Sequence, residues 1–389
     1  MSRQKILFIL GTRPEAIKLC PLILHLRGLG ERYQVRVCVT AQHRQMLDHV
    51  LSAFGVVPDH DLDLMRPGQS LLGSTSRMLA ALEPVLELER PGLIVVQGDT
   101  TTTLCGALAS FYQQVPVAHV EAGLRTGDLR QPFPEELNRV LTTRMTRLHF
   151  AATSQAAQNL VREGVRPQQI TVTGNTGIDA LLHVQQGLED GRYRSVDWAG
   201  NSRKLIVVTA HRRESFGAGF ERICAALAAI AEREDVQLVF PVHPNPNVQQ
   251  PVKAYLASHP RIRLIAPLDY VPFVDLLRQS YLLLSDSGGI QEEAPSLGKP
   301  VLVLREKTER PEAVEGGTAR LVGTDQKRMV AETNLLLDSP QEYMRMTRPG
   351  NPYGDGHASG RIEAELRRFF AGNGEASREC RSAAAGARD

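Results

Sequence analysis

The sequence has few of the features that mark specialised classes of protein. Its five cysteines show no C-x-x-C or metal-ligand spacing and indicate a reducing compartment; they are Cys20, Cys38, Cys105, Cys224 and Cys380. The formal net charge of +2 is too small to indicate binding to nucleic acid or membranes. The apolar run near the N-terminus is short and ends in a polar loop, so we expect neither a signal peptide nor a membrane span. These observations predict a cytoplasmic globular protein.

Several nucleotide-binding, hydrolase and metal motifs are also absent. No G-x-G-x-x-G occurs, and Gly298-Lys299 is followed by Pro300 where a P-loop needs Ser or Thr. There is no Ser-His-Asp elbow. The pair Asp61 and Asp63 has the D-x-D form in a predicted edge segment, but the histidine and cysteine spacings supply no ligand set. We therefore predict no metal site.

One pattern recurs along the 389 residues: a short apolar run, a polar loop with Gly or Pro, then a stretch of helical spacing. This alternation predicts α/β architecture with parallel sheets covered on both faces. The predicted strands are 6–10, 35–39, 93–96, 117–120, 148–151, 205–208, 237–240, 262–265, 282–284 and 301–304. The length suits two Rossmann-like, doubly wound domains, at 1–175 and 176–361. We expect a last helix at 362–371 to pack on the first domain, and a disordered tail at 372–389.

Charged and polar residues gather in the loops that follow the predicted strands. In open α/β sheets, ligands bind outside the carboxyl ends of the strands. The sequence therefore predicts two ligand-binding sheet ends that face each other across a cleft. The loops are 11–18, 40–45, 97–103, 120–128, 209–217, 242–247, 285–289 and 305–312.

The loop after strand 282–284 is the strongest candidate for a nucleotide site. Ser287, Gly288 and Gly289 lie between the strand and a predicted helix, where free backbone N–H groups suit a phosphate. Glu292 and Glu293 follow one turn later and could accept hydrogen bonds from a ribose diol. The alternative is an ordinary strand-to-helix turn with a solvated acidic first turn.

The first half of the chain supplies cations and carboxylates. Arg13 lies at a helix mouth beside Pro14 and Lys18 about one turn along, which suits a diphosphate, although both could be solvated surface residues. Asp99 ends a strand before four threonines and could instead be a helix cap. Glu121 also ends a strand, where an enclosed carboxylate needs a reason to be there.

Two further groups complete the candidate set. Glu135 and Glu136 open a predicted helix and could be no more than its acidic first turn. His211, followed by Arg212, ends a strand of the second half, where an isolated histidine is more often structural. The whole set suits acid/base chemistry on the sugar of a nucleotide sugar whose phosphates are held by cations.

Six motifs resemble those of a known family. They are GTRPEAIK, QGDTTTT, HVEAGLRTGD, PEELNR, TAHRRESFG and SDSGGIQEEAPSLGKPVLVLREKTERPEAV. They are similar to the motifs of UDP-N-acetylglucosamine 2-epimerases of the bacterial non-hydrolysing kind, from about Lys5 to Phe370. The resemblance implies two domains of the glycosyltransferase-B type, an isomerase of polysaccharide biosynthesis, no metal, no nicotinamide or other cofactor, and a homodimer.

The resemblance also implies a reaction and its residues. UDP-GlcNAc and UDP-ManNAc would interconvert by elimination of UDP to a 2-acetamidoglucal and re-addition. The catalytic residues would be Lys18, Asp99, Glu121, Glu135 and His211, and the UDP contacts Arg13, His211, Ser287, Gly288, Gly289, Glu293 and Arg310. Two alternatives share the fold: a hydrolysing epimerase that releases ManNAc, and a nucleotide-sugar transferase. A third alternative is a UDP-sugar sensor, which would bind its ligand without turnover.

A second, regulatory UDP-GlcNAc site is the last expectation from the resemblance. Its residues would be Gln42, Gln45, Glu136, Arg212 and His243. The chain departs from the family pattern at Gly68, where family members often carry a basic residue just before Gln69. Arg66 is the nearest substitute.

Overall fold

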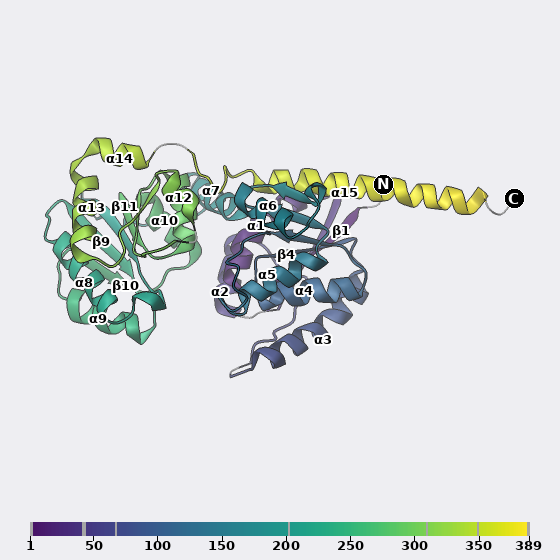
Figure 1. The fold of residues 1–389 in the computed structure, drawn as a ribbon, viewed down its shortest axis with the longest axis horizontal. Coiled ribbons are helices and arrows are strands. Elements are labelled where there is room, and N and C mark those ends of the chain that lie inside the picture. Colours follow the sequence, from purple (N-terminus) through teal and green to yellow (C-terminus); the bar gives the residue numbers. More distant parts are fainter. Residues whose placement is uncertain are drawn as a thin grey trace. The chain divides into compact units, whose positions relative to one another are not determined.

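The computed structural model describes residues 3–40, 44–66, 68–200, 203–308, 310–347 and 350–386. The chain divides into two compact units (Figure 1). The first unit is Met1–Ala180 with Gly356–Asp389, and the second is Leu181–Asp355. The predicted boundary at 175–176 lies five residues before this division. Each unit holds one parallel sheet, so the expected α/β architecture is confirmed.

The first unit is built on a seven-stranded parallel sheet in the order β3-β2-β1-β4-β5-β6-β7. Alternate residues of β1 face opposite layers of helices, and Leu7 and Ile9 pack in the cluster formed with α3 and α4. The strands are β1 (Gln4–Leu10), β2 (Tyr33–Val39), β3 (His60–Asp61), β4 (Leu93–Gln97), β5 (Val117–Val120), β6 (Leu148–Ala151) and β7 (Ile170–Val172). The helices are α1 (Arg13–Gly28), α2 (Arg44–Ala53), α3 (Leu71–Glu89), α4 (Thr101–Tyr112), α5 (Glu135–Met145), α6 (Ser154–Arg162), η1 (Pro167–Gln169) and α15 (Ala358–Gly386). Helix α7 (Thr176–Glu189) begins in this unit and continues into the second.

The second unit has a six-stranded parallel sheet in the order β10-β9-β8-β11-β12-β13. Ile206 and Val208 of β8 pack on one face and Val207 packs on the other, so helices bury both faces. The strands are β8 (Lys204–Thr209), β9 (Val236–Pro241), β10 (Ile262–Ile265), β11 (Leu282–Ser285), β12 (Val301–Val303) and β13 (Ala319–Leu321). The helices are η2 (Arg213–Ser215), α8 (Ala218–Ala231), α9 (Pro246–Leu256), α10 (Tyr270–Gln279), α11 (Gly288–Glu293), η3 (Ala294–Leu297), α12 (Pro311–Glu315), α13 (Gln326–Asp338) and α14 (Pro340–Met346).

All ten predicted strands occur, and three further strands were missed. The missed strands are β3, β7 and β13, which have two or three residues each and lie at sheet edges. An edge strand is covered less fully than a central one, so it carries no long apolar run for a sequence pattern to detect. The edge position predicted for Asp61 is correct, because Asp61 lies in β3.

The last helix, α15, packs on the first unit. Glu363 accepts hydrogen bonds from Arg32 Nη1 at 2.9 Å and from the Tyr33 hydroxyl at 3.1 Å, and Phe370 lies beside the Tyr33 ring. The helix continues to Gly386. The disordered tail expected from residue 372 stays a prediction. Among the described residues, no helix is long and apolar enough to span a membrane.

Candidate active site

Glu121 stands directly after β5 and is held by two partners. One carboxylate oxygen pairs with Lys18 Nζ, and the other accepts a hydrogen bond from the Gln97 side chain. Its φ of +63° lies in the left-handed region, which side chains other than glycine rarely adopt. The Glu121 side chain is only 7% exposed, and the ion pair explains how the carboxylate tolerates that enclosure. Lys18 and Glu121 therefore form one ion pair in which the opposite charges compensate each other.

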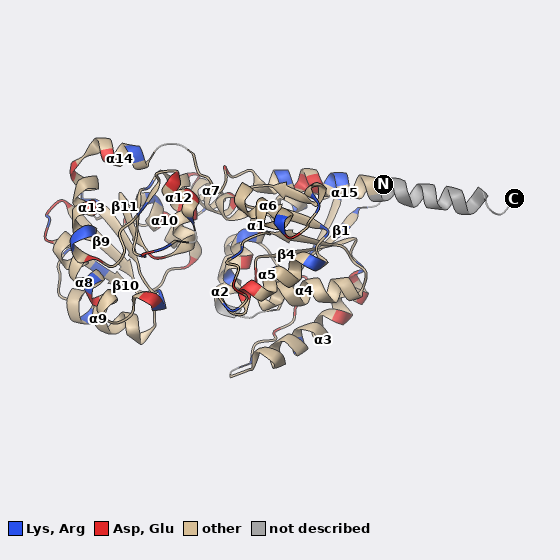
Figure 2. Ribbon diagram, viewed as in Figure 1, with Lys and Arg blue, Asp and Glu red and all other residues tan. Residues whose placement is uncertain are grey.

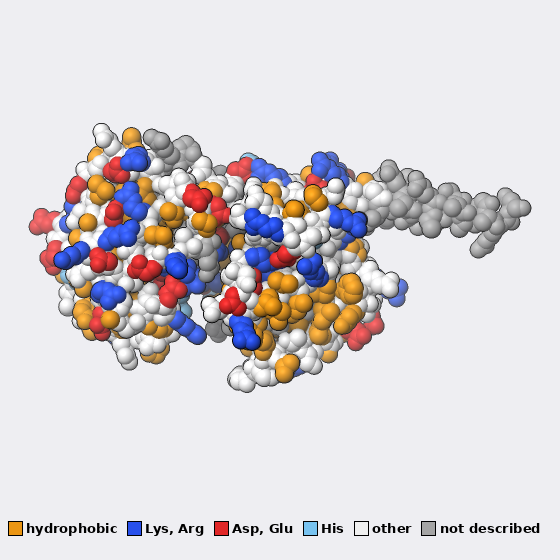
Figure 3. Space-filling view, viewed as in Figure 1, with side chains coloured by type: hydrophobic (Ala, Val, Ile, Leu, Met, Phe, Trp, Pro, Cys, Tyr) orange, Lys and Arg blue, Asp and Glu red, His pale blue; other side chains and the backbone are white. Residues whose placement is uncertain are grey.

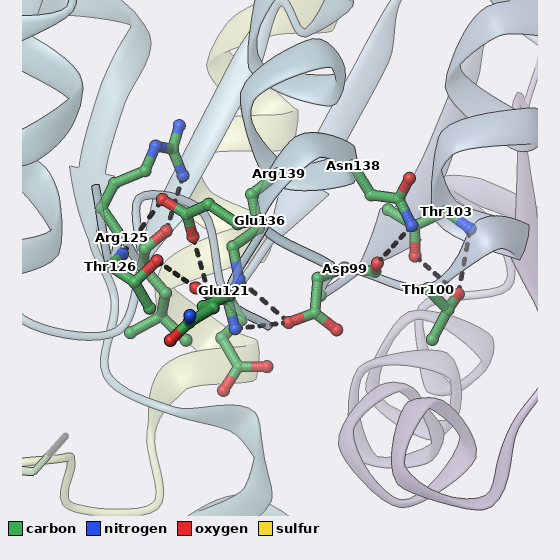
Figure 4. Close-up of polar contacts among 12 residues, drawn as sticks. Asp99, Thr100, Thr103, Glu121, Arg125, Thr126, Glu136, Asn138 and Arg139 are labelled. Carbon is green, nitrogen blue, oxygen red and sulfur yellow. Dashed lines mark hydrogen bonds and ion pairs between the residues drawn. The ribbon is translucent and has the colours of Figure 1, made fainter. Parts of the chain in front are cut away.

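Asp99 belongs to a second network, which Figure 4 shows with Arg139 between two carboxylates. Arg139 Nη2 lies 2.7 Å from Asp99 Oδ2, and Arg139 Nη1 lies 2.9 Å from Glu136 Oε2. Burial lowers the pKa of Arg139, but the two carboxylates more than offset this and raise it above the ordinary value. Asn138 donates to the Asp99 carbonyl at 2.8 Å, so α5 holds both the backbone and the side chain of Asp99.

Glu135 and Glu136 are neighbours with different surroundings. Glu136 is buried, and its Oε1 accepts from the backbone N–H groups of Thr126 and Gly127, at 3.0 Å each. Glu135 is half-buried at the start of α5, and its side chain makes no hydrogen bond or ion pair with any other described residue. Glu136 shapes the loop, whereas Glu135 has a carboxylate available for proton transfer.

In the second unit, the carboxylate of Asp286 shapes the loop that carries His211. Asp286 is fully buried, and its Oδ2 accepts from the backbone N–H groups of His211 and Arg212, at 2.7 Å each. His211 Nδ1 lies 3.3 Å from Asp286 Oδ1, and the ring stacks on His243 with centroids 5.4 Å apart. Burial lowers the pKa of His211, and Asp286 opposes this shift.

The predicted phosphate loop has the expected strand–turn–helix form. Ser287 precedes α11, and its N–H donates to the Ser285 hydroxyl at 3.0 Å. A Cβ added to Gly288 would come within 3.3 Å of the Arg310 guanidinium carbon, so that guanidinium lies against the loop. Arg310 Nε in turn donates to Glu292 Oε1 at 2.7 Å. The backbone at Gly288 and the guanidinium of Arg310 are therefore adjacent at this turn.

The structure gathers the candidates into one set in each unit. In the first unit they follow the adjacent strands β1, β4 and β5, and in the second they follow β8, β11 and β12. Figure 2 shows residues of both charge signs on each unit. No group of three or more His, Cys, Asp or Glu side chains in the described part of the chain could hold a metal.

Comparison with known proteins identifies the family of the chain. The family described as UDP-N-acetylglucosamine 2-epimerase matches residues 29–367. The chain belongs to this family. The UDP-N-acetylglucosamine 2-epimerase of Escherichia coli strain K12 is 54% identical over 371 residues, which are 93% of this chain and 98% of that protein. The enzyme of Salmonella typhimurium is 52% identical over 372 residues, 94% and 99% of the two chains.

Solved structures of the epimerase family share the fold. The UDP-GlcNAc 2-epimerase of Neisseria meningitidis, solved bound to UDP-GlcNAc, is 45% identical with a TM-score of 0.86, covering 94% of this chain and 100% of that one. A glycotransferase of kitacinnamycin has a TM-score of 0.64 at 13% identity, covering 95% and 99% of the chains. The second likeness shows only that the fold is shared with glycosyltransferases.

The expected regulatory residues of this epimerase family lie in different parts of the structure. Glu136 is buried in the first unit, and Arg212 and His243 lie in the second. Gln42 lies outside the described residues, and only the backbone of Gln45 is described. The structure does not test this set.

The departure from the family pattern at Gly68 has a local reason. Its φ is +66°, in the left-handed region where a residue with a Cβ would be strained. Gln69 follows and accepts a hydrogen bond from Arg77. A basic side chain at position 68 would therefore be strained in this turn.

Several residues of the site were not singled out from the sequence, among them Gln97, Asn138 and Arg139, which contact Asp99 or Glu121. Asp286 and Glu15 lie within the quoted motifs but carry no signal that distinguishes them from other acidic loop residues. His119 is buried in β5, and its Nε2 lies 2.7 Å from the Gly98 carbonyl. Burial lowers the pKa of His119 to about 3, so the neutral ring donates to the turn that precedes Asp99.

Proposed function

We propose that this protein reversibly converts UDP-GlcNAc to UDP-ManNAc without hydrolysis. The observation that carries the proposal is the pairing of Glu121 with Lys18 and of Asp99 with Arg139 at the carboxyl ends of adjacent strands. The cations hold these carboxylates in place, and a positioned carboxylate can accept or deliver a proton. The names of the relatives indicate the substrate and the epimerised position.

The reaction proceeds by elimination and re-addition. A carboxylate accepts the C2 proton, the C1–O bond breaks, and its electron pair leaves with UDP, so that a 2-acetamidoglucal with a C1=C2 double bond remains. The UDP oxygen then adds back to C1, while an acid delivers a proton to the opposite face of C2. The atoms balance without water, an oxidant or a metal ion.

Asp99, Glu121 and Glu135 serve as the proton acceptors and donors. Lys18 lies within bonding distance of Glu121 and compensates its charge as the proton moves. Glu135 makes no bond to another described side chain, so its carboxylate can turn towards the sugar without breaking an existing contact.

The departing UDP is stabilised mainly by the second unit. Ser287, Gly288 and Gly289 offer a hydroxyl and backbone N–H groups, and Arg310 lies against Gly288. His211 and the first unit's Arg13 contribute further donors for the diphosphate, and Glu293 accepts hydrogen bonds from the ribose. Donors aimed at the charge that develops on a leaving group lower the barrier most.

The test is incubation with UDP-GlcNAc followed by proton NMR. A mixture of UDP-GlcNAc and UDP-ManNAc is the expected result, and free ManNAc with UDP would identify a hydrolysing enzyme instead. In D2O, deuterium should enter C2 without any acceptor present. A nucleotide-sugar transferase would show no such exchange.

A homodimer is supported by an exposed apolar face on α3, α4 and α5. Figure 3 shows hydrophobic side chains gathered over these helices. Leu88 is 72% exposed, Phe111 58% and Tyr112 72%, which is unusual for large apolar residues on one face. We expect Tyr112→Asp to shift the sedimentation coefficient towards the monomer. A wild-type chain that sediments as a monomer at micromolar concentration would contradict the proposal.

Activation by a second molecule of UDP-GlcNAc stays a prediction. It expects sigmoidal dependence of the rate on UDP-GlcNAc concentration, and weakening of that cooperativity in Gln45→Ala. A hyperbolic dependence in the wild-type enzyme would mean that no regulatory site operates in this chain.

A further inference from the structure

Glu15 is a fully enclosed carboxylate in the first turn of α1. Its Oε2 accepts from the backbone N–H of Gly11 at 3.1 Å and from the Thr12 hydroxyl at 2.7 Å. Thr12 is the N-cap of α1, and its hydroxyl oxygen lies 3.5 Å from the backbone nitrogen of Glu15, so the two residues form a capping box. The contacts of Oε2 therefore stabilise the start of α1 and, among the described residues, reach no other helix or strand.

The other oxygen of Glu15 reaches a different helix. Oε1 lies 2.8 Å from the Thr100 hydroxyl and 3.3 Å from the Thr103 hydroxyl. Thr100 is the N-cap of α4, where its oxygen accepts from Thr103 N–H at 3.1 Å. An ordinary capping box needs no such contact. One carboxylate therefore joins the first turns of two helices that lie 85 residues apart in sequence.

The two joined turns carry groups that we assign to the reaction. The α1 turn contains Arg13, and the turn after β4 contains Asp99 immediately before Thr100. Because β1 and β4 are neighbours in the sheet, the two turns open at the same sheet edge. A displacement of the Glu15 side chain would therefore change the distance between Arg13 and Asp99.

The chemistry of Glu15 favours a role beyond holding a helix end. All its partners are neutral, no cation pairs with it among the described residues, and burial raises its pKa to about 7. A buried carboxylate without a cation destabilises the fold. Only a carboxylate can accept hydrogen bonds on both oxygens, whereas the amide of glutamine offers one acceptor oxygen.

We propose that Glu15 is a positioning residue of the epimerisation reaction, which holds the turn of Arg13 and the turn of Asp99 at a fixed spacing. The inference rests on the proposed function. Misplacing a reacting group by about 1 Å can lower a rate by about 100-fold. Glu15 itself need not contact the sugar.

The decisive variant is Glu15→Gln, measured by steady-state epimerisation and by UDP binding. We expect kcat to fall by roughly 10-fold to 100-fold. UDP binding should weaken by a smaller factor, because Arg13 is only one of several donors proposed for the diphosphate. The matched control is Glu31→Gln, because Glu31 is exposed on the same unit and makes no bond with another described residue.

A second pair of variants approaches the link from α4. Thr100→Val removes the hydroxyl that contacts Glu15, and Thr153→Val removes a threonine that caps α6 in the same way without contacting Glu15. We expect a lower kcat only in Thr100→Val. The double variant should lose less kcat than the two single losses combined predict, because Thr100→Val and Glu15→Gln both disturb the same contact between Thr100 and Glu15.

The outcomes separate this inference from the proposed function. A wild-type enzyme that does not epimerise UDP-GlcNAc overturns the proposed function. An active wild type with unchanged kcat in folded Glu15→Gln overturns only the positioning role. Equal losses of kcat in Thr100→Val and Thr153→Val would show that capping alone matters, which also overturns it.

Discussion

The acidic residues that closely follow the central strands have different partners in the two units. In the first unit, Asp99 and Glu121 face cations, and the ion pairs bring charge to the end of the sheet. In the second unit, the buried Asp286 accepts from backbone N–H groups and so shapes the loop of His211. The first edge is suited to moving protons and the second to holding an anion. The comparison teaches that two similar folds can use acidic residues differently, through the partners of those residues.

The largest effect should come from removing a carboxylate of the first edge. Asp99→Asn or Glu121→Gln is expected to lower kcat by ~100-fold or more, up to the ~10,000-fold typical of general acid/base groups. The affinity for UDP should stay nearly unchanged, because these groups act mainly in the transition state. Stopped-time NMR assays and calorimetry with UDP measure the two quantities.

Glu332→Gln is the control for that experiment. Glu332 pairs with Arg320 in the second unit, and neither residue belongs to the proposed site. The variant therefore loses an ion pair without losing a proposed catalytic group. Full activity in Asp99→Asn or Glu121→Gln would show that the residue has no role in proton transfer.

The pH dependence of stability tests the buried carboxylate Glu15 of the first unit. The pKa of Glu15 is raised from 4.5 to about 7, so the folded chain binds this proton more tightly than the unfolded chain. The group's contribution is therefore fully present below pH 4.5 and is lost as pH rises through 7. Relative to Glu15→Gln, wild type should lose roughly 3 kcal/mol over this window. Urea unfolding followed by circular dichroism at several pH values measures the difference; parallel curves would refute it.

Asp286→Asn should weaken the second edge. Replacing an ionised acceptor of two backbone N–H groups with an amide removes charge-assisted hydrogen bonds, and the loop of His211 loses its anchor. We expect about 10-fold weaker UDP binding, by about 1.4 kcal/mol. Asp325→Asn is the control, because Asp325 also accepts a backbone N–H, from Arg328, at the start of α13. Equal effects in both variants would contradict a specific role for Asp286.

The smallest effect concerns the charge of His211. Because burial lowers its pKa, the ring should become protonated only below the ordinary histidine value of 6.5. A protonated ring attracts the diphosphate, so the affinity for UDP-GlcNAc should rise a few-fold as pH falls through that region. Calorimetry in a Glu121→Gln background measures binding without turnover. The gain should be absent after His211→Asn, and an equal gain in that variant would rule out His211 as its source.

Sequence patterns were sufficient for the elements with strong local signals. The buried central strands are continuous apolar runs, so their positions follow from neighbouring residues alone. The two-residue β3 and the three-residue β7 and β13 carry no such signal.

The sequence by itself determined which residues end the strands and therefore which side chains can reach a ligand. That information is local, because a strand and the turn after it are adjacent in the chain. Only the tertiary structure decided the partners: Lys18 meets Glu121 across 103 positions, and Glu15 meets Thr100 across 85. Such pairings depend on strand order and on distances of a few ångströms between separate helices, which no spacing along a single chain encodes.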